Sequence, residues 1–252
     1  MRLAFGFAAL GLLVVAMSGT GARADEIGPL AGKRFGAGTK VTVVLLHGDV
    51  SRGGPADYLY PVAEGIAQRH PGASVYAVLR PGYEDSVGLV SPGSNNGRRD
   101  HYTEENNDLV AVALQAVKLP GVPLVALGHS GGAAQLGVVI ARHPGLVDTA
   151  ILAACPCDIL RWREMQGRRP WNFSQSPQAF VDDVPATTHV RALTGTADEN
   201  TAPTLAEDYV ASLSGRGVDA VFQPVPGAGH DFNGAFAAAA VAAVETEIDR
   251  IR

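Results

Sequence analysis

The chain has 252 residues, of which 46% are hydrophobic and 18% are charged, and this is enough for one folded domain with a sizeable apolar core. Its formal net charge is −5, and a mildly acidic surface argues against nucleic acid as a partner. The sequence shows no internal repeat, heptad pattern or low-complexity segment, which excludes a repeat architecture or a coiled coil.

The first 24 residues have the features of a secretory signal peptide. Arg2 supplies a positive charge, residues 3–17 are apolar and uncharged, and Ala-Arg-Ala at 22–24 fits an A-x-A cleavage site. The apolar stretch is shorter than the about 20 residues that a membrane-spanning helix needs, so an uncleaved anchor is the weaker alternative. We therefore expect a secreted or periplasmic protein made of residues 25–252, with no stable membrane anchor after cleavage.

Strands and helices are predicted to alternate after this leader. Residues 25–40 leave room for at most one edge strand. Continuous aliphatic and β-branched runs, typical of strands buried on both faces of a parallel sheet, occur at 41–46, 74–79, 123–127, 149–154, 189–194 and 220–225. Helices are expected at 57–70, 104–118, 133–142, 203–213 and 234–250. This order predicts an α/β fold with a doubly wound, mainly parallel sheet of about six strands.

Two segments interrupt the alternation. Residues 87–101 are rich in Gly, Ser, Asn and Arg and are expected to form a long loop. Residues 156–188 lose the periodicity, contain both tryptophans and four arginines, and are expected to form a short cap or pocket insertion. Candidates for lining an apolar acyl or alcohol pocket are Tyr83, Trp162, Trp171 and Phe173.

The two cysteines, Cys155 and Cys157, lie in a Cys-Pro-Cys triplet. An exported protein favours a disulfide, but a bridge across one residue is tight and would be easily reduced, so two free thiols are an equal alternative. A redox role is disfavoured because the usual spacing is C-x-x-C. A metal site is disfavoured because no histidine is nearby.

A nucleophile-elbow motif follows the third of these strands. Gly128-His129-Ser130-Gly131-Gly132 matches G-x-S-x-G between a predicted strand and a predicted helix. The outer glycines permit the strained turn, because a Cβ there would crowd the strand against the helix. Ser130 is therefore the candidate nucleophile, and the N–H of Gly131, at a helix N-terminus, is a candidate oxyanion donor. The alternative is a chance match in a chain with 30 Gly.

A serine nucleophile needs a base, and the base needs an acid that fixes its tautomer. His230 is the candidate base because it lies in a Gly-rich loop after the last strand and completes the chain order Ser, acid, His. Asp198, just after the strand at 189–194, is the favoured acid. Asp158 is its main rival, and Glu199 and Asp231 are further alternatives.

These motifs resemble those of the α/β-hydrolase superfamily over nearly the whole mature chain. The segments that carry the resemblance are His47-Gly48-Asp49, residues 80–86, the elbow, the Asp198 turn and Gly229-His230-Asp231-Phe232. It implies Ser130 as nucleophile, Asp198 as acid and His230 as base. It also implies the N–H of Asp49 as second oxyanion donor, although a carboxylate there is unfavourable unless it points away from the developing charge.

A weaker similarity links the C-terminal half to dienelactone-hydrolase-like enzymes and to the catalytic domain of prolyl-oligopeptidase-type peptidases. The α/β-hydrolase resemblance implies a serine hydrolase that cleaves a small-molecule carboxylic ester through an acyl-enzyme on Ser130, with no cofactor or metal, and the leader adds the expectation that it is exported. The alternatives are a small serine peptidase or amidase, an acyltransferase to an alcohol acceptor, and a non-catalytic binding module. The sequence does not define the oligomeric state.

Overall fold

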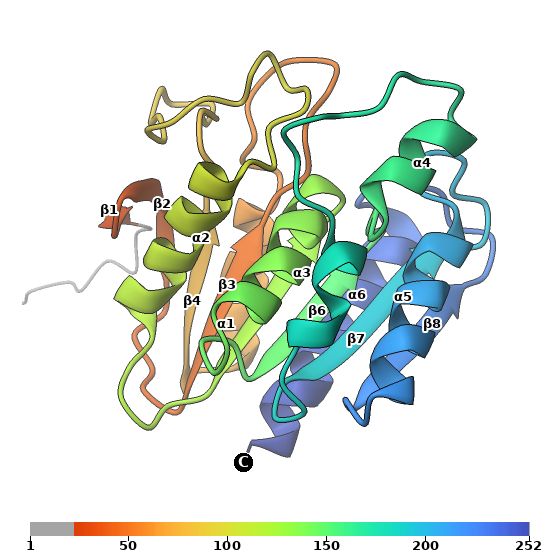
Figure 1. Ribbon diagram of the computed structural model, residues 1–252. Helices are drawn as coiled ribbons and strands as arrows, with labels where there is room; N and C mark the ends of the chain where they lie inside the picture. Colours follow the sequence, from red (N-terminus) through yellow and green to blue (C-terminus); the bar gives the residue numbers. More distant parts are fainter. Residues whose placement is uncertain (1–22, 252) are drawn as a thin grey trace, which may run out of the picture.

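The computed structural model describes residues 23–251. The predicted signal peptide lies outside the described residues, except for its last two positions, where the first strand begins. One sheet of eight strands runs through the molecule in the order β1-β2-β4-β3-β5-β6-β7-β8 (Figure 1). Its six parallel strands are β3 (Val41–Leu46), β4 (Ala73–Val78), β5 (Leu124–His129), β6 (Thr149–Ala153), β7 (His189–Gly195) and β8 (Ala220–Val225).

The prediction of at most one strand before residue 41 was wrong. Two strands, β1 (Arg23–Ile27) and β2 (Leu30–Phe35), form an antiparallel hairpin, and β2 continues the sheet antiparallel to β4. Gly28, at φ +61°, permits the tight turn between them. Ile27 and Leu30 flank that turn and are buried, so the short hairpin is held by packing that the sequence pattern did not reveal.

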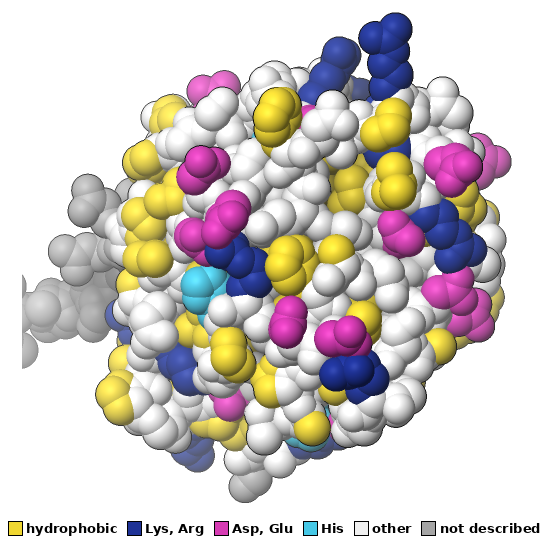
Figure 2. Space-filling view, viewed as in Figure 1, with side chains coloured by type: hydrophobic (Ala, Val, Ile, Leu, Met, Phe, Trp, Pro, Cys, Tyr) yellow, Lys and Arg dark blue, Asp and Glu magenta, His cyan; other side chains and the backbone are white. Residues whose placement is uncertain are grey.

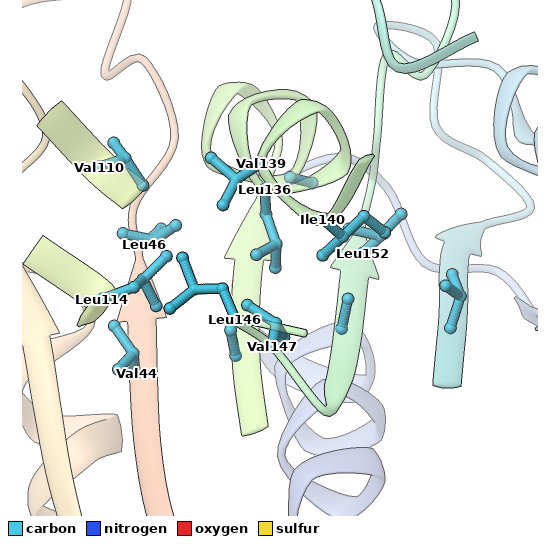
Figure 3. Close-up of a cluster of buried hydrophobic side chains, with 14 of the residues drawn as sticks. Val44, Leu46, Val110, Leu114, Leu136, Val139, Ile140, Leu146, Val147 and Leu152 are labelled. Carbon is cyan, nitrogen blue, oxygen red and sulfur yellow. The ribbon is translucent and has the colours of Figure 1, made fainter. Parts of the chain in front are cut away.

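Helices cover both faces of the sheet, as expected for a doubly wound fold. The helices α2 (Glu104–Val117), α3 (Gly131–Arg142) and α5 (Pro203–Gly215) pack on one face, and α1 (Tyr60–Arg69) and α6 (Gly234–Arg250) pack on the other (Figure 1). All six residues of β3 are buried because both of its faces are covered. Val44 and Leu46 point to the α2 and α3 side, where Figure 3 shows them among Leu114 and Leu136.

Local sequence signals explain several element boundaries. The side chain of Thr103 caps α2 by accepting a hydrogen bond from the Asn106 N–H (3.3 Å), as the sequence predicts, with two glutamates in the first turn. On the outer surface of this helical layer, acidic and basic side chains are interspersed (Figure 2), and Arg142 pairs with Glu104 and Asp108. Such exposed pairs contribute little stability.

The segment between β6 and β7 contains α4 (Ile159–Met165) and a 3-10 helix (Pro177–Asp183). In Figure 1, α4 lies beyond the carboxyl ends of the strands, and the chain then returns along α3 to the start of β7. Cys155 and Cys157, at the start of this segment, form a disulfide with a Cα–Cα distance of 5.0 Å. No helix within residues 23–251 is both long enough and apolar enough to cross a membrane.

Candidate active site

Ser130 occupies a sharp turn between β5 and α3. Its backbone has φ +53° and ψ −117°, a strained conformation for a residue with a Cβ. The close packing of this turn explains the two outer glycines: a Cβ on Gly128 would lie 2.5 Å from the Gly132 carbonyl oxygen, and one on Gly132 would lie 2.4 Å from that of Leu46. The turn therefore holds the Ser130 side chain at the carboxyl end of β5.

The structure brings Ser130, His230 and Asp198 into one hydrogen-bonded line. The Ser130 hydroxyl lies 3.0 Å from His230 Nε2, and His230 Nδ1 lies 2.8 Å from Asp198 Oδ2. These distances suit a proton on Nδ1 that is donated to the carboxylate, which leaves Nε2 free to accept the Ser130 proton. The three residues follow β5, β7 and β8, which lie in order across one half of the sheet.

Asp198 is held as an ionised acceptor by the loop that follows it. Its Oδ1 accepts from the N–H groups of Asn200 and Thr201, both at 2.8 Å, and its Oδ2 accepts from the Thr201 hydroxyl at 2.7 Å. Burial tends to raise the pKa of Asp198, but the hydrogen bond and charge of His230, with the Thr201 bonds, bring it below its ordinary value. The carboxylate is thereby suited to orient His230 and to stabilise its cation.

The rival acid, Asp158, has a different place in the structure. Its side chain caps α4 by accepting a hydrogen bond from the Arg161 N–H at 3.1 Å. Asp198, and not Asp158, is the carboxylate in hydrogen-bonding contact with His230.

Asp49 lies beside the N-terminus of α3 in a buried ion pair. Its Oδ1 is 2.5 Å from Nη2 of Arg80, and its Oδ2 accepts from the Tyr102 hydroxyl at 2.5 Å. Burial opposes ionisation, but the positive charge of Arg80 leads the effects that lower the pKa of Asp49. The sequence raised the concern of an uncompensated carboxylate near an oxyanion; in the structure Arg80 matches that charge. Gly131 is required here too, because a Cβ on it would lie 2.1 Å from Asp49 Oδ1.

The four predicted pocket residues do not gather in one place. Trp162 and Trp171 stack edge to face with ring centroids 5.2 Å apart, and the Trp162 indole N–H donates to the carbonyl of Asn200, which lies next to His230, at 2.7 Å. Phe173 is 71% exposed. Tyr83 is buried behind the Asp49 turn, where its hydroxyl donates to the Asp49 carbonyl at 3.0 Å. The two tryptophans are thus the pair that remains beside the candidate site.

Several residues at this site were not identified from the sequence as site residues. Asn200 and Thr201 lie two and three residues after Asp198, and the Asn200 amide nitrogen is 3.1 Å from His230 Nε2. Polar residues in the loop after the candidate acid were the available signal. Tyr58 and Tyr102 reach the site from distant segments and carried no signal. In the part of the chain that the structure describes, no group of three or more His, Cys, Asp or Glu side chains could hold a metal ion.

Solved structures with the same fold include proteins named as esterases and one named as a puromycin hydrolase. Esterase Pf2001 from Pyrococcus furiosus has a TM-score of 0.69 at 15% identity, covering 92% of this chain and 93% of that one. Esterase PE8 has a TM-score of 0.63 at 18% identity, covering 86% and 98%. A puromycin hydrolase has a TM-score of 0.67 at 15% identity, covering 92% of this chain but 39% of its own. The TM-scores show a shared fold, and at identities of 15–18% they show the fold alone.

A comparison with curated proteins finds no significant match. The family model described as "Prolyl oligopeptidase family" matches residues 94–248, which is more than half of the chain and includes Ser130, Asp198 and His230. With the α/β-hydrolase fold of the neighbours and the elbow geometry, this match shows that the chain belongs to the prolyl oligopeptidase family of the α/β-hydrolase superfamily.

Proposed function

We propose that this protein is a serine hydrolase that cleaves carboxylic esters through an acyl-enzyme on Ser130. The observation that carries the proposal is the line from Ser130 Oγ through His230 to Asp198, with contacts of 3.0 and 2.8 Å, on a strained turn at a helix N-terminus. Nothing in this arrangement is needed for a folded core, because a strained serine and a partly buried polar line both cost stability.

The proposed reaction has two halves. Ser130 Oγ attacks the ester carbonyl carbon while His230 Nε2 takes its proton, and the N–H groups of Gly131 and Asp49 stabilise the oxyanion. His230 then gives the proton to the departing alcohol, which leaves the acyl group on Ser130. In the second half, water loses a proton to His230 and attacks the acyl carbonyl carbon. His230 then gives this proton to Ser130 Oγ as the carboxylic acid leaves.

Amide or peptide cleavage is the second candidate. The family match and the named puromycin hydrolase support it, because the same triad cleaves amides. Ester cleavage is preferred because the neighbours named as esterases align with nearly their whole chains, whereas the puromycin hydrolase aligns over 39% of its length.

A substrate panel separates the two candidates. Purified mature protein is assayed on p-nitrophenyl acyl esters of increasing chain length and on aminoacyl p-nitroanilides, with Ser130→Ala as the blank. We expect ester turnover that depends on chain length and falls by roughly four to six orders of magnitude in kcat for Ser130→Ala. Faster turnover of the anilides would assign a peptidase, and undiminished activity of Ser130→Ala would reject the proposed nucleophile.

The segment 156–188 is proposed to shape the substrate pocket through its two tryptophans. Trp171 is partly exposed and stacks on Trp162 and Tyr102, with ring centroids 5.2 and 5.3 Å away. Trp171→Ala is expected to change the preference among ester chain lengths more than it changes kcat on the best substrate. Identical preference in the variant and the parent would remove Trp171 from the pocket.

Export is proposed from the leader sequence. Cleavage after Ala24 would remove two residues of β1 and leave the pairs from Asp25 with Gly32 to Ile27 with Leu30. When the full chain is expressed with its leader in a bacterial host, we expect the processed protein outside the cytoplasm with Asp25 as its first residue. Intact Met1 in the cytoplasmic fraction would contradict this proposal.

A further inference from the structure

His129, the second residue of the elbow, has a hydrogen-bond partner on each side of its ring. It is buried, with 6% of its surface exposed. Its Nε2 lies 3.0 Å from the carbonyl oxygen of His230, and its Nδ1 lies 2.6 Å from the hydroxyl oxygen of Tyr58. The same Tyr58 oxygen accepts a hydrogen bond from the Gly48 N–H at 2.5 Å. A continuous chain of contacts therefore joins the backbone of His230 to the backbone of Gly48.

The direction of every hydrogen bond in this chain is determined. A carbonyl oxygen only accepts, so His129 Nε2 carries a proton and donates to His230. Burial, followed by the positive charge of His230, lowers the pKa of His129 to about 3, so the ring is neutral near pH 7 and its Nδ1 holds a lone pair. Tyr58 must then donate its proton to Nδ1, and its oxygen is free to accept from Gly48.

This series of hydrogen bonds joins the two parts of the site whose relative position matters most for acyl transfer. His230 is the proposed base. Gly48 precedes Asp49, the proposed second oxyanion donor, and a Cβ on Gly48 would lie 3.2 Å from Ser130 Cβ, so this turn packs directly on the nucleophile. Donors must lie within about 3 Å of the oxyanion, and small displacements weaken them.

We propose that His129 and Tyr58 are positioning residues, which hold the His230 loop and the Gly48–Asp49 turn at a fixed separation across Ser130. This role rests on the proposed function, since it concerns the same reaction. It explains why a histidine occupies the second elbow position, where the backbone turn alone makes no demand on the side chain.

Tyr58→Phe is the first test. It removes one oxygen and leaves Gly48 N–H and His129 Nδ1 without their partner. Because the loss acts on the oxyanion turn in the transition state, kcat is expected to fall about tenfold or more with little change in KM. Tyr60→Phe is the matched control: its hydroxyl donates to Asp85 at 3.2 Å, away from the triad, and kcat is expected to stay within about twofold. Equal kcat for Tyr58→Phe and the parent would overturn the proposal.

Two replacements of His129 distinguish the effect of its hydrogen bonds from the effect of its packing. His129→Leu removes both hydrogen bonds, whereas His129→Asn places a carbonyl oxygen near the former Nδ1, where Tyr58 can still donate to it. We expect His129→Asn to recover at least about fivefold in kcat over His129→Leu. Equal loss in both variants, or a loss in KM alone, would show that His129 is not a positioning residue.

A spectroscopic measurement tests the hydrogen-bond arrangement without substrate. In 15N NMR spectra of the mature protein at pH 7, His129 is expected as the neutral tautomer with its proton on Nε2, and Tyr58→Phe should shift the Nδ1 resonance. A proton on Nδ1 would overturn the inference. If the parent protein cleaves no ester or amide, the proposed function fails; if the parent is active and Tyr58→Phe equals it, the inference fails alone.

Discussion

Replacing Asp49 by alanine should cost much more stability than replacing the carboxylate of an exposed pair. The Arg80 side chain is 0% exposed and the Asp49 side chain is 8% exposed, so Asp49→Ala leaves a guanidinium buried without its counter-charge. Removing one partner of a buried pair typically costs about 3–5 kcal/mol, and we expect that loss here. For a chain of this size the loss lowers Tm by roughly 10 °C.

The assay is urea unfolding followed by tryptophan fluorescence at pH 7, with Asp208→Ala as the control. Asp208 pairs with Arg161, and the two side chains are 58% and 42% exposed, so its removal should cost less than about 1 kcal/mol. The double variant Asp49→Leu with Arg80→Met should regain most of the stability, because no charge is left buried. Equal losses for Asp49→Ala and Asp208→Ala would refute the reasoning.

Three further predictions concern acid stability, the elbow and the acid of the triad. Burial is the main effect that lowers the pKa of His101 to about 4 in the folded protein. In the unfolded chain a histidine has a pKa near 6.5, so between these two pH values the unfolded state binds a proton at His101 that the folded state does not bind. This group should therefore lower the free energy of unfolding by about 1.4 kcal/mol for each pH unit between pH 6.5 and 4. Urea unfolding of His101→Gln should show a smaller decrease with falling pH. The same pH dependence in the variant and the parent would contradict the role of His101. Gly131→Ala places a Cβ 2.1 Å from the buried Asp49 carboxylate, so both Tm and kcat should fall. Gly215→Ala is the control: its Cβ meets no atom within 4 Å, so kcat should stay unchanged and Tm should stay unchanged or rise. Unchanged Tm and kcat in Gly131→Ala would show that the turn can move. Asp198→Asn should lower kcat by about 10⁴ because it favours the wrong His230 tautomer, whereas Asp158→Asn should keep full activity; the reverse order would return the acid role to Asp158.

Several elements could be predicted closely from the sequence. The bounds expected for β3, β8 and α6 agree with the structure residue for residue. β3 is buried on both faces and is therefore a continuous aliphatic run in the sequence. β8 contains Pro224, and the structure places β8 at the edge of the sheet, where proline is tolerated.

The β1–β2 hairpin was missed because its stability comes from distant contacts. β1 packs against α2, and β2 pairs with β4, both far along the chain. Neither contact leaves a periodic pattern within residues 25–40. The candidate site shows the same limit. Ser130, Asp198 and His230 follow strand ends, so they could be proposed from the order of elements along the chain. Tyr58 contacts the site through the Gly48 N–H and through His129, which is 71 residues away in sequence, and neither contact can be read from a local pattern. Likewise the sequence showed that a carboxylate at Asp49 is unfavourable beside an oxyanion, but it did not show that Arg80 pairs with this carboxylate.

The turn at residues 48–50 shows how the fold and the proposed chemistry depend on each other. Three backbone groups of this turn bond to side chains from separate segments: the Gly48 N–H to Tyr58, the Asp49 carbonyl to Tyr83 at 3.0 Å, and the Val50 carbonyl to Arg98 at 2.5 Å. Val50 has φ +44°, an unfavourable conformation for a β-branched residue, so these contacts must compensate for strain.

A buried ion pair is rarely more stabilising than a well-packed apolar pair, so stability alone does not explain why Asp49 and Arg80 lie under this turn. Directional bonds fix a backbone more narrowly than apolar packing does, because each one specifies both a distance and an angle. We therefore interpret the polar cluster as a support for the backbone of residues 48–50, which includes the Asp49 N–H, the proposed second oxyanion donor. It follows that a variant that removes one partner of the support, such as Asp49→Ala, should lose stability and kcat together, and that Asp49→Leu with Arg80→Met should regain stability but not kcat. Ser130→Ala should lose only kcat.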